Sequence, residues 1–249
     1  MSNRLANKVA IVTGGTRGIG RAIANAYLGE GARVLITGTT QARAEQAAAL
    51  LAASNRCIGI GADLNDPAAV QPIVDRARAA FGRIDVLVNN AGIGSGTNVW
   101  DVTIDEWDRI ANVNVRAAFF LSQAAGKMMR ADGGGSILNV ASMAGQNGGI
   151  AGSPSYAAAK AGVIGMTRAL ARRFAADRIR VNALSPADIV TDMTAVFPAP
   201  IRAQLIAITP LGRFGEVSEV TGAAVFLASD EASYITGQVL NINGGAFMG

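Results

Sequence analysis

Hydrophobic and polar residues alternate along this chain in two kinds of segment. Short runs rich in Val and Ile, such as Val9–Val12, are separated by longer Ala-rich segments whose apolar positions have helical spacing. This alternation of strand and helix is typical of a parallel sheet covered by helices on both faces. The pattern predicts strands at residues 8–13, 33–37, 57–61, 85–89, 135–141, 179–184 and 238–242. It predicts helices at residues 18–30, 41–53, 67–80, 104–130, 154–177 and 216–228.

The fold class is therefore predicted to be α/β, with one doubly wound parallel sheet of about seven strands. A chain of 249 residues, half of them hydrophobic, can bury one core of this class, so we expect a single domain at residues 1–249. Residues 187–210 are longer than an ordinary connection and hold several prolines. A loop of this kind at the carboxyl end of a parallel sheet is a candidate substrate lid.

Composition narrows the possible chemistry. The chain contains one cysteine, Cys57, and no histidine. An internal disulfide and a His/Cys metal site are thereby excluded, and we predict no metal. Histidine-dependent catalysis, including the Ser-His-Asp triad, is excluded for the same reason. Acid–base chemistry near neutral pH must therefore use another side chain.

The net charge of +4 raises the question of a nucleic-acid partner. Basic residues such as Arg76, Arg78 and Arg83 are scattered among acidic ones, which is typical of a solvated surface, so we expect no such partner. The apolar runs are too short to span a membrane, and the N-terminus lacks the apolar core of a signal peptide. We expect a soluble, cytoplasmic protein.

A glycine-rich turn follows the first predicted strand and reads TGGTRGIG from Thr13 to Gly20. Glycines at this spacing let backbone N–H groups approach a diphosphate at the start of the next helix. Glycines alone are weak evidence because turns need them anyway, but the strand–turn–helix context predicts dinucleotide binding. The residues expected to contact the cofactor here are Gly14, Thr16, Arg17, Gly18, Ile19 and Gly20.

The end of the second predicted strand bears on the choice of cofactor. An acid there would hold the ribose hydroxyls and repel a 2′-phosphate, but the turn reads ITGTT, with Thr39 and no carboxylate. Arg17 can approach the same place and pair with a phosphate dianion, although it could also be a plain surface cation. We predict that NADP(H) is preferred over NAD(H).

Tyr156 and Lys160 are spaced i, i+4 on the helix predicted after Pro154, so their side chains share one face. A nearby ammonium favours the phenolate and lowers the pKa of a tyrosine, as a proton donor and acceptor requires. Alone, this pair is common in helices.

Further motifs occur in a specific order along the chain. They are TGGTRGIG at 13–20, Asp63, NNAG at 89–92, Asn114, Ser142, YAAAK at 156–160 and NALSP at 182–186. This set resembles the short-chain dehydrogenase/reductase family over essentially the whole chain, which implies a Rossmann fold. Within the family it looks most like the bacterial β-ketoacyl-(acyl carrier protein) reductase branch, which contains many ketoreductases of other specificity.

The resemblance implies four catalytic roles. Tyr156 protonates the carbonyl oxygen during reduction, and Lys160 lowers its pKa while holding the nicotinamide ribose. Ser142 would hydrogen-bond the carbonyl. Asn114 matches the residue that helps hold a proton-relaying water, although the nearby Asn112 leaves the helical register open and a mid-helix polar residue is the alternative.

The resemblance also implies contacts along the rest of the cofactor. Asp63, followed by Leu64, would lie beside the adenine, although the same residues form an ordinary turn and helix cap. The remaining expected contacts are Asn90, Ala91 and Gly92 on the adenosine ribose side, and Pro186, Ile189 and Thr191 toward the carboxamide. Ala187 stands where the family commonly has glycine, which predicts a modest change of geometry.

The predicted substrate lining consists of residues 94–97, 143–152 and 188–205 and is mostly small and apolar. It suits a hydrophobic ketone or alcohol, as expected for an NADP(H)-dependent ketoreductase or alcohol dehydrogenase. The alternative is a 3-oxoacyl-(acyl carrier protein) reductase of fatty-acid synthesis, and a non-enzymatic NADP(H)-binding sensor is a further one. Basic residues available to an acyl carrier protein are Lys127, Arg130, Arg172 and Arg173.

The helices predicted at 104–130 and 154–177 carry more apolar surface than one sheet contact requires. The residues concerned are Trp107, Phe119, Phe120, Met166 and Phe174. The family resemblance implies a homotetramer built on such helices, with the apolar C-terminus at 244–249 at a second interface.

Overall fold

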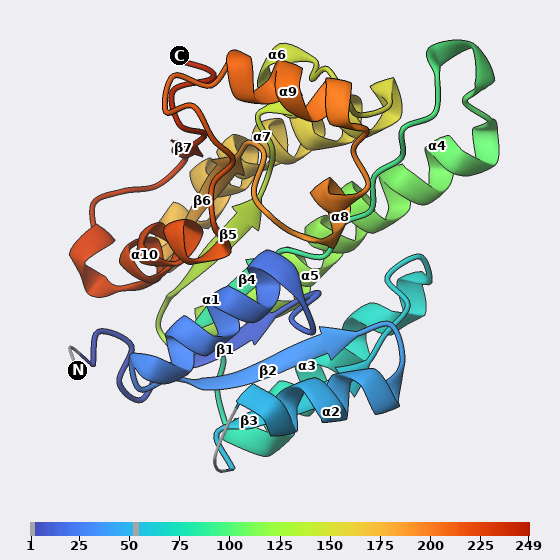
Figure 1. Cartoon of the computed structure of the whole chain (residues 1–249). Helices are drawn as coiled ribbons and strands as arrows, with labels where there is room; N and C mark the ends of the chain where they lie inside the picture. Colours follow the sequence, from blue (N-terminus) through green and yellow to red (C-terminus); the bar gives the residue numbers. More distant parts are fainter. Residues whose placement is uncertain (1–2, 52–54) are drawn as a thin grey trace.

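A computed structural model describes residues 3–51 and 55–249 of the chain. Seven parallel strands form one sheet in the order β3–β2–β1–β4–β5–β6–β7 (Figure 1). The strands are β1 (Val9–Val12), β2 (Arg33–Gly38), β3 (Cys57–Gly61), β4 (Val86–Asn89), β5 (Gly135–Val140), β6 (Ile179–Pro186) and β7 (Val239–Ile242). The predicted single-domain doubly wound α/β sheet is confirmed.

Helices cover both faces of this sheet. The long ones are α1 (Gly18–Gly29), α2 (Gln41–Leu51), α3 (Val70–Phe81), α4 (Ile104–Ala111), α5 (Ala117–Ala131), α7 (Pro154–Phe174), α9 (Ala199–Ala207) and α10 (Val217–Ala228). Shorter pieces are α6 (Ala144–Asn147), α8 (Asp192–Ala195), the π-helical η3 (Asn112–Arg116) and the 3₁₀ turns η1 (Pro67–Ala69), η2 (Val99–Asp101), η4 (Ala175–Asp177) and η5 (Asp230–Ala232).

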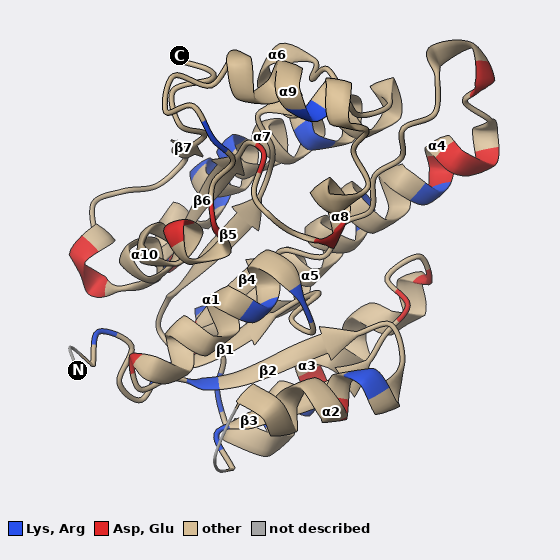
Figure 2. Ribbon diagram, in the orientation of Figure 1, with Lys and Arg blue, Asp and Glu red and all other residues tan. Residues whose placement is uncertain are grey.

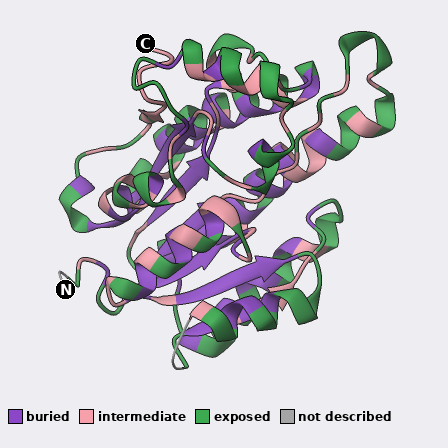
Figure 3. Ribbon diagram, viewed as in Figure 1, coloured by how far each residue is buried: buried purple, intermediate pink, exposed green. Residues whose placement is uncertain are grey.

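The core has two halves, one on each face of the sheet. Ala10 and Val12 of β1 pack into the half that α1, α2 and α10 cover. Val9 and Ile11, which point the other way, pack into the half covered by α3, α5 and α7. Figure 3 shows the central strands as buried along their length. Because both faces are covered, the strands form continuous hydrophobic runs rather than alternating ones.

The strand order reverses at the boundary between β1 and β4, because the chain builds outward from β1 to β3 and then crosses to the other side of β1. At such a switch point, the loops that leave the two strands diverge and open a space at their carboxyl ends. The glycine turn at 13–20 leaves β1 and the NNAG segment at 89–92 leaves β4. The topology therefore brings these two motifs together.

Several predicted boundaries change in the structure. The predicted helix 104–130 is divided into α4, the π-helical η3 and α5, and the helix at 67–80 begins as a 3₁₀ turn. The last turn predicted for the helix at 154–177 is the 3₁₀ turn η4. The helix at 41–53 is seen to Leu51, and its residues 52–53 lie outside the described residues.

Residues 187–210 are not an irregular loop, as the sequence led us to expect, because they contain α8 and α9. Two of the prolines that suggested a loop instead lie at the start of a helix. Pro198 is the N-cap of α9 and Pro200 lies in its first turn, where a proline needs no N–H partner.

Lysines and arginines occur on most helices rather than gathering on one element, as Figure 2 shows. Among residues 3–51 and 55–249, no helix is long and apolar enough to cross a membrane.

Candidate active site

The glycine turn is fastened to the segment after β4. The Asn90 side-chain amide donates to the carbonyl oxygens of Thr13, at 2.9 Å, and Gly14, at 3.2 Å. In return, the Thr13 hydroxyl accepts from the backbone N–H groups of Asn90 and Ala91, each at 3.0 Å. The side chain of Asn90 and the backbone N–H groups of Asn90 and Ala91 therefore hold the turn in place.

Two glycines of the turn meet different requirements. Gly14 has φ of 62°, in the left-handed region that side chains avoid. Gly20 is required for close approach, since a Cβ there would lie 2.3 Å from both the Gly14 carbonyl oxygen and the Asn90 amide nitrogen. The first turn of α1 contains no acidic residue, and Arg17 at its N-cap makes no side-chain cap. The helix N-terminus is thus available to an anionic ligand.

Two arginines lie near the end of β2 and the glycine turn. Arg17 is 76% exposed at its side chain and pairs with the 70% exposed Asp192 at 2.9 Å. Arg43, in the first turn of α2, donates to the Thr39 hydroxyl at 3.5 Å. The sequence analysis missed Arg43, which its position just after the second strand could have indicated.

Asp63 and Leu64 lie just after β3, in a turn. The Asp63 carboxylate accepts from the backbone N–H of Asn65 at 2.9 Å, and Leu64 is buried. The helix cap is the neighbouring Asp66, which accepts from Ala68 at 2.8 Å. The structure thus gives Asp63 the turn role that the sequence indicated and gives the cap to Asp66.

Tyr156 and Lys160 lie on the same face of α7, as their spacing predicts. The Lys160 ammonium lies 5.7 Å from the centroid of the Tyr156 ring and donates to the Val140 carbonyl oxygen at 2.7 Å. The close packing of α6 on α7 depends on Gly145, since a Cβ there would lie 2.5 Å from the Lys160 carbonyl carbon. Lys160 is thereby fixed between α7 and the end of β5.

Asn114 lies in the π-helical turn η3 and is only 2% exposed. Its amide nitrogen donates to the carbonyl oxygens of Ile93 and Ile110, each at 2.9 Å. Its Oδ1 is buried and has no hydrogen-bond partner within the described chain. A Cβ placed on Gly92 would lie 2.6 Å from this oxygen and 3.4 Å from the Lys160 Nζ, so all three border one small space.

The structure shows which of the two asparagines, Asn112 or Asn114, faces Lys160. Asn112 turns away and donates to Asn65 at 3.2 Å. Asn114 faces Gly92 and Lys160 because the wider π turn rotates the residues that follow α4. Asn114 Oδ1 is thus a buried acceptor that faces the space beside Gly92 and Lys160.

Known proteins resemble this chain over nearly its whole length. Residues 14–246 match a family model described as enoyl-(acyl carrier protein) reductase. A 3α-hydroxysteroid dehydrogenase from Mediterraneibacter gnavus is 44% identical over 248 residues, covering 97% of this chain and 98% of that protein. A 3-oxoacyl-(acyl-carrier-protein) reductase from Salmonella typhimurium is 42% identical over 241 residues, with the same two coverages.

A solved structure from Sinorhizobium meliloti 1021, described as a short-chain alcohol dehydrogenase, superimposes with a TM-score of 0.93 at 38% identity, covering 99% of this chain and 98% of that one. The chain belongs to the short-chain dehydrogenase/reductase family. It is an oxidoreductase that acts on CH–OH or C=O groups, and the family implies a nicotinamide dinucleotide as its cofactor.

The pKa of the site tyrosine differs from what spacing alone indicates. In this short-chain dehydrogenase/reductase, burial raises the pKa of Tyr156, the Ser142 hydroxyl opposes that rise by hydrogen bonding, and the Asp188 carboxylate adds to it. We expected Lys160 to lower this pKa, but burial outweighs any such effect. Burial also lowers the pKa of the Lys160 ammonium to about 8.

Ser142 follows β5 by two residues and accepts from the backbone N–H of Ala144 at 3.1 Å. On either side of the tyrosine ring lie Gly94 and Gly152, because a Cβ on either would lie 3.4 Å from a carbon of Tyr156. The predicted substrate segments at 94–97 and 143–152 thus meet at the Tyr156 ring.

The nicotinamide edge predicted from Pro186 to Thr191 lies opposite the glycine turn. A Cβ on Gly18 would lie 3.4 Å from the Thr191 methyl group, and Ile189 is buried in the core. Ala187 does not have a positive φ, so alanine meets no backbone strain where the family commonly has glycine.

The lining of the substrate side is partly apolar, as predicted, with Ile150, Met193 and Val196 exposed and Met143 buried. The sequence analysis gave no role to one acidic side chain here, Asp188, whose Oδ2 is buried without a hydrogen-bond partner. Within residues 3–51 and 55–249, no group of three or more Cys, Asp or Glu side chains could hold a metal ion.

Proposed function

We propose that this protein is an NADP(H)-dependent ketoreductase or alcohol dehydrogenase in which Tyr156 donates and accepts the proton. The observation that supports this most strongly is the convergence of the Lys160 ammonium, the Tyr156 ring and the buried Asn114 Oδ1 near the segment that follows β4. Within the described residues, this oxygen has no hydrogen-bond partner. A protein that only binds a dinucleotide has no need for this arrangement.

Side chains of the protein donate the proton to the substrate and replace it afterwards. Because burial raises its pKa, the Tyr156 phenol keeps its proton at neutral pH and can give it to a carbonyl oxygen during reduction. Ser142 hydrogen-bonds that oxygen, and Lys160 with Asn114 Oδ1 holds a water that returns a proton to the phenolate. The nicotinamide, when bound, supplies the hydride in reduction and takes it up in oxidation.

We assign the cofactor preference to NADP(H). The end of β2 carries Thr39 and no carboxylate, and two cations lie beside this edge of the site. Arg43 is held at Thr39, and Arg17 needs only to exchange its exposed partner Asp192 for a phosphate. Exposed ion pairs are weak, so a phosphate dianion competes well for Arg17.

A general ketone or secondary alcohol is the proposed substrate class. The alternative, a 3-oxoacyl-(acyl carrier protein), is supported by the Salmonella typhimurium relative. Of the basic residues that could receive a carrier protein, however, Arg130 is paired with Asp177 at 3.1 Å. Asp177 places a negative charge within that surface and lowers its net positive charge, which favours the small-molecule substrate.

The first experiment follows NADPH consumption with a panel of apolar ketones, one 3-oxoacyl thioester and one enoyl thioester. Turnover of the ketones supports the proposal. Exclusive turnover of the 3-oxoacyl thioester moves the assignment to fatty-acid synthesis, and exclusive turnover of the enoyl thioester rejects carbonyl chemistry. Tight NADPH binding without any turnover indicates a sensor.

The pH dependence of ketone reduction is expected to follow the protonation of the Lys160 ammonium. Its ammonium, with a pKa of about 8, loses its proton as the pH rises through that value, whereas the Tyr156 phenol stays protonated. We expect kcat/KM for ketone reduction to be level from pH 6 to 7.5 and to fall by about tenfold per pH unit above 8.

Initial rates in overlapping buffers measure this profile. Lys127→Arg changes an exposed lysine on α5 and should leave the fall of kcat/KM above pH 8 unchanged. Lys160→Arg should move that fall above pH 10, because a guanidinium keeps its proton. A level profile to pH 9.5 in the unaltered protein rules out the role given to the ammonium.

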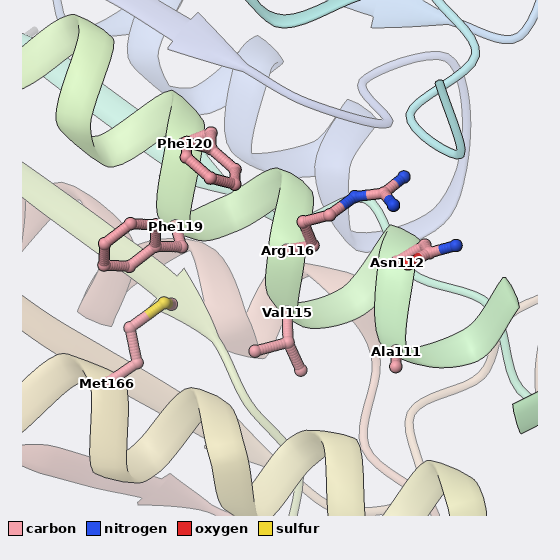
Figure 4. Close-up of a pocket in the computed structure, with 7 residues that line it drawn as sticks. All are labelled: Ala111, Asn112, Val115, Arg116, Phe119, Phe120 and Met166. Carbon is pink, nitrogen blue, oxygen red and sulfur yellow. The ribbon is translucent and has the colours of Figure 1, made fainter. Parts of the chain in front are cut away.

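We propose a homotetramer whose subunits meet on α5, η3 and α7. The hollow between these helices is lined mainly by apolar side chains, and Figure 4 shows Phe119 and Met166 turned toward one another across it. Phe119 and Phe120 form an edge-to-face pair and are 38% and 42% exposed.

Phe174, which we expected on this surface, instead packs against the core beside Gly126. The C-terminal segment, with Met248 exposed, supports a second contact.

Phe119→Asp is expected to dissociate this assembly. A carboxylate that would be buried without a partner weakens such a contact by about 100-fold or more. Sedimentation velocity measures the species present at micromolar protein. Leu50→Asp, the same kind of change on exposed α2, should leave the assembly intact. A monomer in the unaltered protein would refute the proposal.

A further inference from the structure

Asp188 stands out among the acidic residues near the site because its carboxylate is not satisfied. Its Oδ2 is buried and lacks a hydrogen-bond partner within residues 3–51 and 55–249. Asp192, four residues further on, is by contrast exposed and paired with Arg17. The residue as a whole is half-buried, but a carboxylate oxygen that is buried without a partner costs desolvation energy, so Asp188 Oδ2 calls for a ligand.

The backbone around Asp188 is fixed. Its carbonyl oxygen accepts from the Gly215 N–H at 2.9 Å, and the Val190 N–H donates back to the Gly215 carbonyl oxygen at 2.8 Å. Ile189 and Gly215 form a parallel bridge and pack closely, since a Cβ on Gly215 would lie 2.7 Å from the end of the Ile189 side chain. The carboxylate is therefore presented from a rigid segment.

The segment that carries Asp188 lies beside the tyrosine site. The carbonyl oxygen of Pro186, two residues before Asp188, accepts from the Met143 N–H at 2.9 Å, next to Ser142. The Asp188 carboxylate lies near enough to Tyr156 for its charge to raise the pKa of the phenol, and burial raises the pKa of Asp188 itself.

We infer that Asp188 determines substrate specificity by accepting a hydrogen bond from a donor group, a hydroxyl or an ammonium, close to the reacting carbonyl of the substrate. This inference rests on the proposed function and deepens it, because an otherwise apolar lining would then select a hydroxyketone or aminoketone. A site built to bond a donor rejects the analogue that lacks it, since the acceptor is left unpaired.

The test compares matched ketone pairs with NADPH, one bearing a hydroxyl or amine beside the carbonyl and the other a hydrogen or methyl group there. In the unaltered protein, kcat/KM should favour the donor-bearing ketone by about 100-fold. Asp188→Ala should reduce that preference to about threefold or less, with the plain ketone as the reference for each protein. Asp105→Asn removes an exposed carboxylate on α4 and should change neither value.

Asp188→Asn separates the two donor chemistries. The amide oxygen can still accept from a hydroxyl, so that preference is partly retained, whereas the preference for an ammonium requires the charge and is lost. The Kd for NADPH, measured by fluorescence titration, should stay within about threefold in every variant. If Asp188→Ala instead weakens NADPH binding and leaves the ketone preference unchanged, the carboxylate pairs with the cofactor carboxamide and the inference is overturned.

Binding measured without turnover keeps this inference distinct from the proposed function. Calorimetry with the Tyr156→Phe variant and NADPH compares the affinities of the same ketone pairs. A donor preference that disappears with Asp188→Ala supports the inference even if the unaltered protein reduces no ketone, an outcome that would contradict the reductase proposal alone. Equal affinities for the two members of each pair overturn the inference.

Discussion

Tyr156→Phe is expected to lower kcat for ketone reduction by about 10³- to 10⁴-fold, while the Kd for NADPH changes by less than about threefold. The substitution removes the hydroxyl that gives its proton to the carbonyl oxygen and retains the ring. That ring lies between Gly94 and Gly152, so its packing is preserved and the loss falls on the chemical step. Single-turnover rates with saturating NADPH measure the effect directly.

Tyr234→Phe is the matched control for this prediction. Tyr234 is fully exposed, so loss of its hydroxyl should leave both kcat and thermal stability unchanged. Retention of more than about a tenth of the activity by Tyr156→Phe contradicts the role of the phenol, since general acid catalysis contributes at least about 100-fold.

Thr39→Asp is expected to shift the ratio of kcat/KM for NADPH over NADH by about 100-fold or more toward NADH. The new carboxylate would stand at the end of β2, where it repels a 2′-phosphate and can accept from the ribose hydroxyls of NADH. It would also occupy Arg43, which the Thr39 hydroxyl now contacts. Steady-state kinetics with both cofactors at several ionic strengths measure the change, which salt should weaken.

Thr39→Asn provides the control for shape, because asparagine has the size of aspartate without its charge. It should change the cofactor ratio by less than about fivefold. If the unaltered protein prefers NADH, or if Asn and Asp variants behave alike, charge at this position does not decide the preference.

Some site residues could be recognised from sequence because they lie on one local element. Tyr156 and Lys160 share a helix face through their spacing, and Gly14 and Gly20 belong to one turn. Local periodicity and backbone sterics impose these relations before any tertiary contact forms.

Other features could not be predicted in this way. The choice between Asn112 and Asn114 depends on a π-helical turn that helical spacing does not reveal. The direction of the Tyr156 pKa depends on burial by distant segments, and the exposed pair of Arg17 with Asp192 joins residues far apart in the chain. These are properties of the packed structure.

The sequence by itself determined the α/β class, the order of the motifs along the chain and the family. Hydrophobic periodicity and glycine placement act over short stretches of chain, so they can be recognised without a structure. The tertiary structure alone decided which polar atoms are left unsatisfied. Asn114 Oδ1 and Asp188 Oδ2 are ordinary side-chain oxygens in the sequence. They gain their chemical significance only when helices and strands from across the chain bury them and, within residues 3–51 and 55–249, leave them without a hydrogen-bond partner.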